Sequence, residues 1–515
     1  MPRNIIRIEP IEKINRRDLV TDIGDKQVLS RENLAVIGSK NMKVKKLPGS
    51  SRLNATAVDS TGPITWIHRY YNTTPVARTF FFSQGKLYYT DENGNTSELL
   101  TLFSTNAYPS SVEMRVTGND VLYFSEGNNT GMYSYNGNNG NNFQLESAVT
   151  LNFVGMISWL DRLWGFEENS EVINFSKNLV PTNFTDSTDA GQITIGASRG
   201  SKIMAIALLN ETLYIFKNDS IWEVAGRTPS EFTVNQIVTN LGLAARRSLV
   251  KVESALIGFM SDYELHEFNG TQQTKLLTYD VALYGDLTKD LNPIVNVSRL
   301  DQICAAYHNY IYRMAFCAMD SSTIRNDMEY CRSSINEIDF FTRGNSVSAY
   351  CVYDRPPDRK ELITGRSDTG RLMRQYQGLN WDNDAAGATM SIKTQTKFYG
   401  SPEPQNFRVR RYWGNFGVLG ARNLPIKMFI DARNANSDST SDELITQGET
   451  KSMAMIRINS QLAITSRQIP RHNNSKCQNF SLMIDQNLSD IDLEFSSFNV
   501  EVIQKNIKRS QKVGV

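Results

Sequence analysis

Short runs of apolar and aromatic residues, each joined by a polar turn, recur along the middle of the chain. In residues 211–226, ETLYIFKNDSIWEVAG, two such runs flank Asn218 and Asp219. β-Branched and aromatic side chains fit a pleated strand, and Asn and Asp are favoured in tight turns. The pattern therefore predicts a β-hairpin.

Related segments lie on both sides of this hairpin. Each places Leu or Ile before mixed aromatic residues and a polar turn, and the aligned positions are Leu87, Leu122, Leu163, Leu213, Leu256 and Ile311. These positions are about 45 residues apart, which is the spacing of four-stranded propeller blades. The sequence therefore predicts an all-β protein with a β-propeller of about five to seven blades. A generic β-sandwich array is the alternative, because the intervals are irregular.

The same patterning divides the chain into four regions. Residues 1–47 are charged and weakly periodic, which predicts an extended N-terminal arm that lies on a neighbouring surface or stays mobile. Residues 30–34 within it have the composition of a capped helical turn. The propeller is expected over 48–387. Inside it, 319–344 lacks the blade pattern and is interpreted as a long connection or a short helix.

The C-terminal part of the chain has a different pattern. Residues 388–505 alternate short strand candidates with polar joins, which predicts an additional β-sandwich region. The strand candidates are 389–399, 407–416, 425–431, 453–459, 479–485 and 498–504, with a polar loop over 434–451. Residues 506–515 form a basic tail.

Charge and hydropathy exclude some classes of function. The chain has 55 Lys and Arg against 54 Asp and Glu, so no overall field favours nucleic acid or an anionic membrane. Its first residues lack the apolar core of a secretory signal. The longest apolar run, residues 203–209, is too short to cross a bilayer. We expect a soluble protein made in the cytosol.

The cysteines give no sign of a disulfide framework or a metal site. There are five, Cys304, Cys317, Cys331, Cys351 and Cys477, and no two form a C-x-x-C pair. Disulfide frameworks are typical of small secreted domains, so free thiols are expected in this long chain.

No catalytic motif has the surroundings that its chemistry needs. His68, His266, His308 and His472 are far apart and lack metal-ligand spacing. The string GASRG at 196–200 matches G-x-S-x-G, but that nucleophile elbow requires an α/β sheet, so Ser198 is expected in a turn between strands. We predict no catalytic, cofactor-binding or metal-binding residues, and no enzymatic activity.

Two further segments resemble fragments of the aspartate boxes of sialidase-like propellers. They are residues 91–96 and 367–370, and neither carries the full pattern. Asp, Asn and Gly are also the residues that hairpin turns prefer, so turns are the simpler interpretation.

Two basic clusters are candidates for contact with phosphates or with a partner protein. One contains Lys43, Lys45 and Lys46, and the other contains Arg408, Arg410 and Arg411. Such clusters contact nucleic acid phosphates without sequence preference. Solvated faces and protein interfaces remain the alternative interpretations.

Several segments together resemble a known protein family. They are DRLWGFEENSEVINFSKNLVPTNF from Asp161, the hairpin from Glu211, KNMKVKKLPG from Lys40 and GRSDTGRLMR from Gly365. Together they are similar to the tail-hub or nozzle proteins of short-tailed bacteriophages, also called packaged-DNA stabilization proteins, in which the segment from Asp161 and the hairpin from Glu211 follow in the same order. The resemblance covers most of residues 40–505. The charged arm, the Cys-bearing stretch 317–351 and the loop 434–451 depart from it.

The resemblance implies a structural virion protein of the phage tail, synthesised in the host cytoplasm. It implies a homo-oligomeric ring, usually of six copies, below the portal and adaptor. Such a ring extends the DNA channel, touches the genomic DNA without specificity, retains the genome and supports fibres or a needle. Contact with the host envelope would be only indirect, and no cofactor is implied.

Two other functions are compatible with the same pattern. A glycan-binding propeller for receptor recognition would need exposed aromatic residues on one face, for which Tyr70, Tyr71 and Trp381 are candidates. A propeller glycosidase or esterase would need convergent carboxylates or an activated Ser198.

Overall fold

The computed structural model describes residues 3–17, 26–37, 42–54, 56–70, 78–91, 93–101, 104–105, 107–128, 131–137, 143–196, 200–286, 291–355, 359–382, 384–385, 389–396, 399–400, 406–419, 422–430, 450–458, 463–468, 476–477, 479–488 and 492–505. Their regular structure is β, apart from short 3-10 helices such as η1 (Pro229–Glu231) and η3 (Val297–Gln302). The all-β class predicted from the sequence is confirmed.

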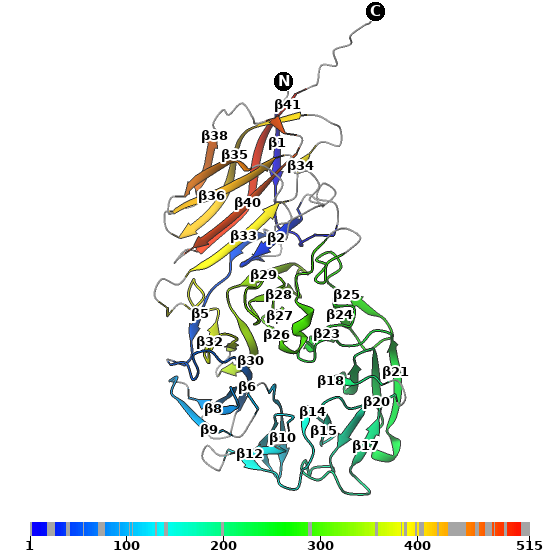
Figure 1. Cartoon of the computed structure of the whole chain (residues 1–515). Helices are drawn as coiled ribbons and strands as arrows, with labels where there is room; N and C mark the ends of the chain where they lie inside the picture. The colour runs from blue at the N-terminus through cyan, green and yellow to red at the C-terminus, as the bar shows by residue number, and fades with distance from the viewer. Residues whose placement is uncertain are drawn as a thin grey trace, which may run out of the picture.

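Seven four-stranded antiparallel units surround a common centre (Figure 1). Blade one contains β6 (Ile64–Tyr70), β7 (Arg78–Ser83), β8 (Lys86–Thr90) and β9 (Thr96–Leu100). Blade two contains β10 (Ser110–Val116), β11 (Asn119–Ser125), β12 (Met132–Tyr135) and β13 (Gln144–Leu145). Blade three contains β14 (Phe153–Trp159), β15 (Arg162–Glu167), β16 (Val172–Phe175) and β17 (Gly191–Thr194). Blade four contains β18 (Ile203–Leu209), β19 (Thr212–Lys217), β20 (Ser220–Ala225) and β21 (Thr233–Thr239). Blade five contains β22 (Val250–Val252), β23 (Ala255–Phe259), β24 (Leu265–Phe268) and β25 (Thr274–Leu276). Blade six contains β26 (Cys304–His308), β27 (Ile311–Phe316), β28 (Met328–Ser333) and β29 (Asp339–Arg343). The predicted propeller is confirmed, with seven blades.

Strand alternation explains how neighbouring blades adhere. In β19 of blade four, Leu213 and Ile215 pack into a core shared with blade three, where Trp164 lies. The intervening Tyr214 and Phe216 pack into a second core shared with blade five. Successive side chains of a strand point to opposite faces, so one blade contributes to two cores at once. The ring is thus held by burial on both faces of each sheet.

Blade seven is completed by a strand from the other end of the chain. It contains β30 (Val347–Arg355), β31 (Arg359–Arg366) and β32 (Leu372–Gln375), and its outer strand is β5 (Ser50–Arg52). β5 pairs antiparallel with β32, with Arg52 opposite Met373. Blades seven and one then share a core containing Ile64, Ile363 and Leu372. The ring is therefore closed by pairing of distant segments, which leaves short edges only.

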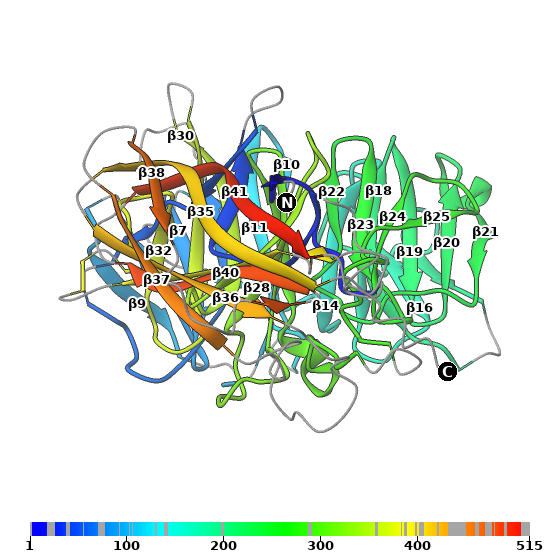
Figure 2. The ribbon, with the colours of Figure 1, turned by 90° about the horizontal axis from the view of Figure 1, so that it is seen from above.

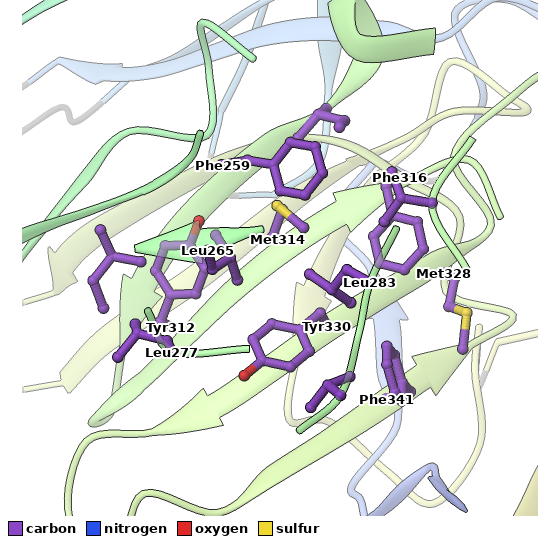
Figure 3. Close-up of a cluster of buried hydrophobic side chains, with 14 of the residues drawn as sticks. Phe259, Leu265, Leu277, Leu283, Tyr312, Met314, Phe316, Met328, Tyr330 and Phe341 are labelled. Atoms are coloured by element: carbon purple, nitrogen blue, oxygen red, sulfur yellow. The ribbon is translucent and has the colours of Figure 1, made fainter. Parts of the chain in front are cut away.

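The largest core of the ring lies between blades five and six. Phe259 and Leu265 from blade five meet Tyr312, Met314 and Phe316 from β27 (Figure 3). Leu283, from the segment that connects the two blades, packs into the same cluster. The same connecting segment is held by a buried carboxylate, Glu264, which accepts hydrogen bonds from Thr278 Oγ1 (2.6 Å) and from the Leu283 amide (3.2 Å).

Glu264 predicts a pH dependence of stability. Burial raises the pKa of the Glu264 carboxyl above its ordinary value. The folded state therefore binds the proton more tightly than the unfolded state, so stability is lost as pH rises through the raised pKa. In a Glu264→Gln variant this loss is absent. We expect urea unfolding at pH 4 to 8 to show the variant gaining stability relative to the natural protein as pH rises. A constant difference across this range would contradict the assignment.

Two packed sheets form a β-sandwich at one edge of the ring, beside blade six (Figures 1 and 2). The strands of the first sheet are β1 (Arg3–Ile8), β3 (Leu34–Ile37), β4 (Lys43–Lys46), β35 (Asn406–Leu419), β38 (Ala463–Gln468), β39 (Lys476–Cys477) and β41 (Asp492–Lys505). The second sheet contributes β2 (Val28–Glu32), β33 (Met390–Thr396), β34 (Tyr399–Gly400), β36 (Arg422–Ile430), β37 (Thr450–Ile458) and β40 (Asn479–Leu488). Phe495 and Val500 of β41 face Phe480 and Ile484 of β40 in one core, which confirms the predicted sandwich.

The second sheet of the sandwich is continuous with blade six. β2 pairs in parallel with β29, Glu32 opposite Phe341, and antiparallel with β33 on its other side. Nine strands therefore follow one another from β26, the innermost strand of the blade, to β37 in the sandwich, and β34, which pairs with β40, completes the ten-stranded sheet. Where the structure describes it, the region predicted as an arm supplies strands to the sandwich. The predicted helical turn at 30–34 is wrong, because residues 30–32 belong to β2, Leu34 begins β3, and Asn33 between them has φ 56°.

Two buried side chains secure this junction. Asn33, with φ 56°, donates Nδ2 to the backbone oxygens of Arg343 (3.0 Å) and Ser391 (2.6 Å) and accepts from the Arg343 amide (3.0 Å). Arg31 is fully buried and donates to the Asp339 and Pro10 oxygens. Burial lowers the pKa of Arg31 to about 10, an effect opposed by the charge of Asp339. Asn33 and Arg31 thus connect the N-terminal segment to residues 339–343 and to Ser391, which are more than three hundred residues away.

Candidate interaction surfaces

Arg247 crosses the centre of the propeller. Arg247 lies between blades four and five, and its guanidinium donates to the oxygens of Thr65 in blade one (3.1 Å) and Ser348 in blade seven (3.0 Å). It also donates to the Gln302 oxygen (3.0 Å), and it lies 4.1 Å from the centre of the Tyr108 ring. One cation therefore links segments on opposite sides of the ring, and cation–π attraction adds to these bonds.

Small polar side chains extend this network. Asn326 donates to the backbone oxygens of Gln302 (2.8 Å) and Val347 (3.0 Å), and Ser367 donates to the Asn326 oxygen (2.7 Å). Ser348 Oγ donates to the Ile64 oxygen (2.6 Å). Side chains thus donate to backbone oxygens near the centre of the ring, as the burial of polar groups requires. The arrangement stabilises the ring and leaves these groups committed to structural bonds.

The inner strands of blades one and two carry a chain of polar contacts that the sequence did not reveal. Trp66 Nε1 donates to Ser111 Oγ (3.2 Å), Ser111 Oγ lies 3.2 Å from His68 Nδ1, and His68 Nε2 lies 2.7 Å from Glu113 Oε1. The order hydroxyl, imidazole, carboxylate resembles a hydrolase triad. Here the hydroxyl is also held by the indole, and the contacts run from β6 to β10. They act as a polar bridge between two blades.

The first predicted basic cluster is largely engaged within the chain. Lys43, Lys45 and Lys46 all belong to β4, a strand of the sandwich. Lys46 is 2% exposed and donates to the Leu379 oxygen, so it is not a surface contact. Lys43 forms an ion pair with Glu494 (2.9 Å), and Lys45 is partly exposed beside Glu494 in the pairing register. The prediction of a phosphate contact is wrong for Lys46, and for Lys43 and Lys45 it stays a prediction.

The second basic cluster lies on the same sheet. Arg408, Arg410 and Arg411 belong to β35, which pairs with β41; Arg411 is opposite Glu501. Lys45 pairs with Glu494 of the same β41, so seven residues, or roughly 23 Å of strand, separate the two clusters. They share a sheet but lie near opposite ends of one strand. Their joint action on one phosphate is excluded by this separation.

The other motif residues mostly occupy turns or pair locally. Asp91 accepts the amides of Asn93 (2.9 Å) and Asn95 (2.8 Å), and Asp368 pairs with Arg366 (2.6 Å), so both aspartate-box fragments are turns. Ser198 and His472 both lie outside the described residues. His266 contacts Asp262 (2.8 Å) within its own blade. Within the described part of the chain, no three His, Cys, Asp or Glu side chains are grouped as a metal site requires.

The thiols and the aromatic candidates are mostly buried. Cys304, Cys317 and Cys331 are buried free thiols, and Cys351 is a partly exposed free thiol. Cys477 lies in β39, and its side chain is outside the described set. Tyr70 is 1% exposed and Trp381 is 9% exposed, so the expectation that they form an exposed glycan platform is wrong. Tyr71 lies outside the described residues.

A pocket of about 130 Å³ opens between blades five and six. Its apolar lining comes from Val252, Ala255, Ile257 and Tyr312, and its polar lining from Glu253, Ser254, Glu267, Lys275, Arg332, Ser333, Ser334 and Glu337. Tyr307 Oη donates to Glu253 Oε1 (3.0 Å), and Arg332 contacts Glu337 (3.2 Å). We call this feature the blade 5–6 pocket. An apolar floor with a charged rim is suited to one apolar side chain of a protein partner.

A wider groove of about 620 Å³ adjoins this pocket and shares Lys275, Arg332 and Glu337 with it. The N-terminal segment forms its other wall, where Lys13 pairs with Asp280. Arg17 lies 4.0 Å from the centre of the half-exposed Tyr279 ring. Charges of both signs line the groove, so it does not select a simple anion or cation.

Among the described residues, no helix has the length and apolar character to cross a membrane.

Comparisons with known proteins extend only to the fold. No family model matches the sequence, and no curated protein matches it. The structure is similar to a catalytically inactive virginiamycin B lyase from Staphylococcus aureus with quinupristin, at 12% identity, covering 63% of this chain and 98% of that chain, with a TM-score of 0.42. It is also similar to BBS1N in complex with ARL6DN, at 11% identity over 64% of this chain and 98% of that chain, TM-score 0.40.

A WD40 domain from Toxoplasma gondii coronin is a further similar structure. Its identity is 9% over 67% of this chain and 86% of that chain, and its TM-score is 0.37. Identities and TM-scores this low carry no argument about the function of this chain. The strand pairing itself shows an all-β propeller protein with an attached sandwich.

Proposed function

We propose that this chain is a structural protein of a bacteriophage tail that assembles into a ring around the DNA channel. In this role it retains the packaged genome and supports fibres or a needle. The proposal starts from the resemblance of the segments around Asp161, Glu211 and Gly365 to tail-hub and nozzle proteins. This role requires stable contacts between proteins and no catalytic turnover.

The observation that carries the proposal is the sheet shared between blade six and the sandwich. Because ten strands form one sheet, the two domains present their outer surfaces in one fixed relation. A body of this kind suits head-to-tail contacts between identical copies, which close into a ring when the rotation allows. Retention of DNA under pressure depends on slow opening of such contacts, so stiffness within each copy supports it.

The experiment is a mass measurement of the purified full chain by mass photometry. We expect one closed species near six times the chain mass of 58.2 kDa, with a mass that does not grow as concentration rises. A ring has a fixed number of contacts, so its mass is independent of concentration. A species of 58.2 kDa at every concentration, or filaments of increasing length, would count against the proposal.

A further inference from the structure

Blade six exposes apolar side chains at both of its ends. Tyr310 precedes β27 and Ile335 follows β28, so these two lie at one end of the hairpin. Met319 and Ile324 lie in the connection between the same strands, at the other end. All four are more than half exposed, with 55% for Met319 and 64% for Ile324. A six-residue strand separates the two ends by about 20 Å.

The first end also carries the blade 5–6 pocket. Glu253 and Ser334, which line the pocket, belong to the turns at this end, and the Ser334 amide donates to the Tyr310 oxygen (2.8 Å). The pocket volume of about 130 Å³ is close to that of a cavity of about 150 Å³ that holds one benzene molecule. One isoleucine or methionine side chain therefore matches it in size. The rim has three carboxylates, Glu253, Glu267 and Glu337, against two cations.

The second end has the complementary properties. We call Met319 and Ile324 the knob. Arg325 directly follows Ile324 and donates to the backbone oxygen of Asp368 (3.1 Å), which fixes its guanidinium beside the knob. An exposed apolar side chain beside a guanidinium matches an apolar floor beside carboxylates. Arginine next to an apolar anchor is also typical of residues that dominate protein interfaces.

We propose that the knob of one copy enters the blade 5–6 pocket of the next copy, with Arg325 near Glu253 and Glu337. This inference rests on the proposed ring function and names the contact that would build the ring. Knob and pocket lie at opposite ends of one blade, so each copy uses its knob on one neighbour and its pocket on the other. That is a heterologous contact, the kind that repeats around a ring.

The test uses two variants of the full chain, one for each half of the contact. Ile324→Glu places a charge on the knob, and Ser254→Trp places an indole at the pocket mouth. We expect each to raise the concentration for half-assembly by at least about 30-fold, as loss of an interface hot spot does. Leu179→Glu is the matched control, because Leu179 is 58% exposed on blade three and should leave assembly unchanged. Circular dichroism is used to check that each variant is folded. Met319→Glu on the knob and Glu253→Lys in the pocket provide a second pair of variants.

Mixing the two variants gives the decisive result. The knob variant keeps an intact pocket and the pocket variant keeps an intact knob, so the mixture should form dimers and nothing larger. Folded variants that assemble like the natural chain, or a mixture that stays monomeric, would overturn the inference. If the natural chain forms its ring while both variants do so equally, only this contact is wrong. If the natural chain is monomeric, both the contact and the ring function fail.

Discussion

Replacing Arg247 with methionine is expected to lower the free energy of unfolding by about 2 to 4 kcal/mol. Methionine keeps most of the aliphatic stem but removes the donors that reach the oxygens of Thr65, Ser348 and Gln302. These oxygens then lack the charged partner that offsets their burial. Denaturant unfolding measures the change. Hydrogen exchange should rise first in β6 and β30, where blades one and seven meet.

The neighbouring Arg246 provides a matched control for this prediction. Its guanidinium donates to the Met204 oxygen (3.1 Å) and to Glu168 (2.7 Å), which are both within blades three and four. Arg246→Met removes the same charge without touching the centre of the ring. We expect a loss below about 1 kcal/mol, as is usual for exposed pairs. Equal losses for the two variants would show that the central position of Arg247 has no special role.

Replacing Asn33 with alanine is expected to lower the free energy of unfolding by about 3 to 5 kcal/mol. The variant leaves the Arg343 amide and the oxygens of Arg343 and Ser391 without their partner. It also places an alanine at φ 56°. This left-handed conformation is less favourable for alanine than for asparagine, whose short polar side chain forms local hydrogen bonds there. The junction between blade six and the sandwich should then separate before the rest of the molecule unfolds.

Hydrogen-exchange mass spectrometry measures this separation directly. In Asn33→Ala, exchange should accelerate in β2, β29 and β33 while blades two to four stay protected. Asn33→Gly is the control, because glycine accepts φ 56° and loses only the side-chain bonds. It should recover about 1 kcal/mol of the loss. Uniform protection across the chain in Asn33→Ala would contradict the role of Asn33 at the junction.

Local patterning is enough to predict most strands of this protein. The alternation around Leu213 and the turn at Asn218 and Asp219 reappear as β19 and β20. The six strand candidates of the C-terminal region coincide with observed strands, because β-branched residues between polar joins carry a local signal. β38 was missed, and only 319–327 of the predicted connection 319–344 lies between β27 and β28, because the rest contains β28 and β29. Their charged residues, such as Glu329 and Arg332, obscure the alternation.

The repeat alignment contains one error with a clear cause. Leu122, Leu163, Leu213 and Leu256 lie in the second strands of their blades, whereas Leu87 lies in β8, the third strand of blade one. The second strand of that blade, RTFFFS, lacks the Leu or Ile before aromatic residues that defined the alignment. Strand composition alone cannot distinguish neighbouring strands of a blade. Blade number therefore had to come from the structure.

Long-range pairing is the part that the sequence could not supply. Nothing in the segment around Glu32 indicates a partner more than three hundred residues away, yet β2 joins β29 to β33. The same holds for Arg247, whose partners come from four separate segments. Period and turn chemistry report which face of a strand is buried, but not which strand lies beside it. The blade 5–6 pocket likewise depends on tertiary packing.

Image averages of tailed particles that contain this chain test the central claim most directly. The account predicts a cyclic ring of copies coaxial with the DNA conduit, with the propeller and sandwich of each copy in one fixed relation. Particles in which the chain is a solitary appendage away from that axis would contradict it.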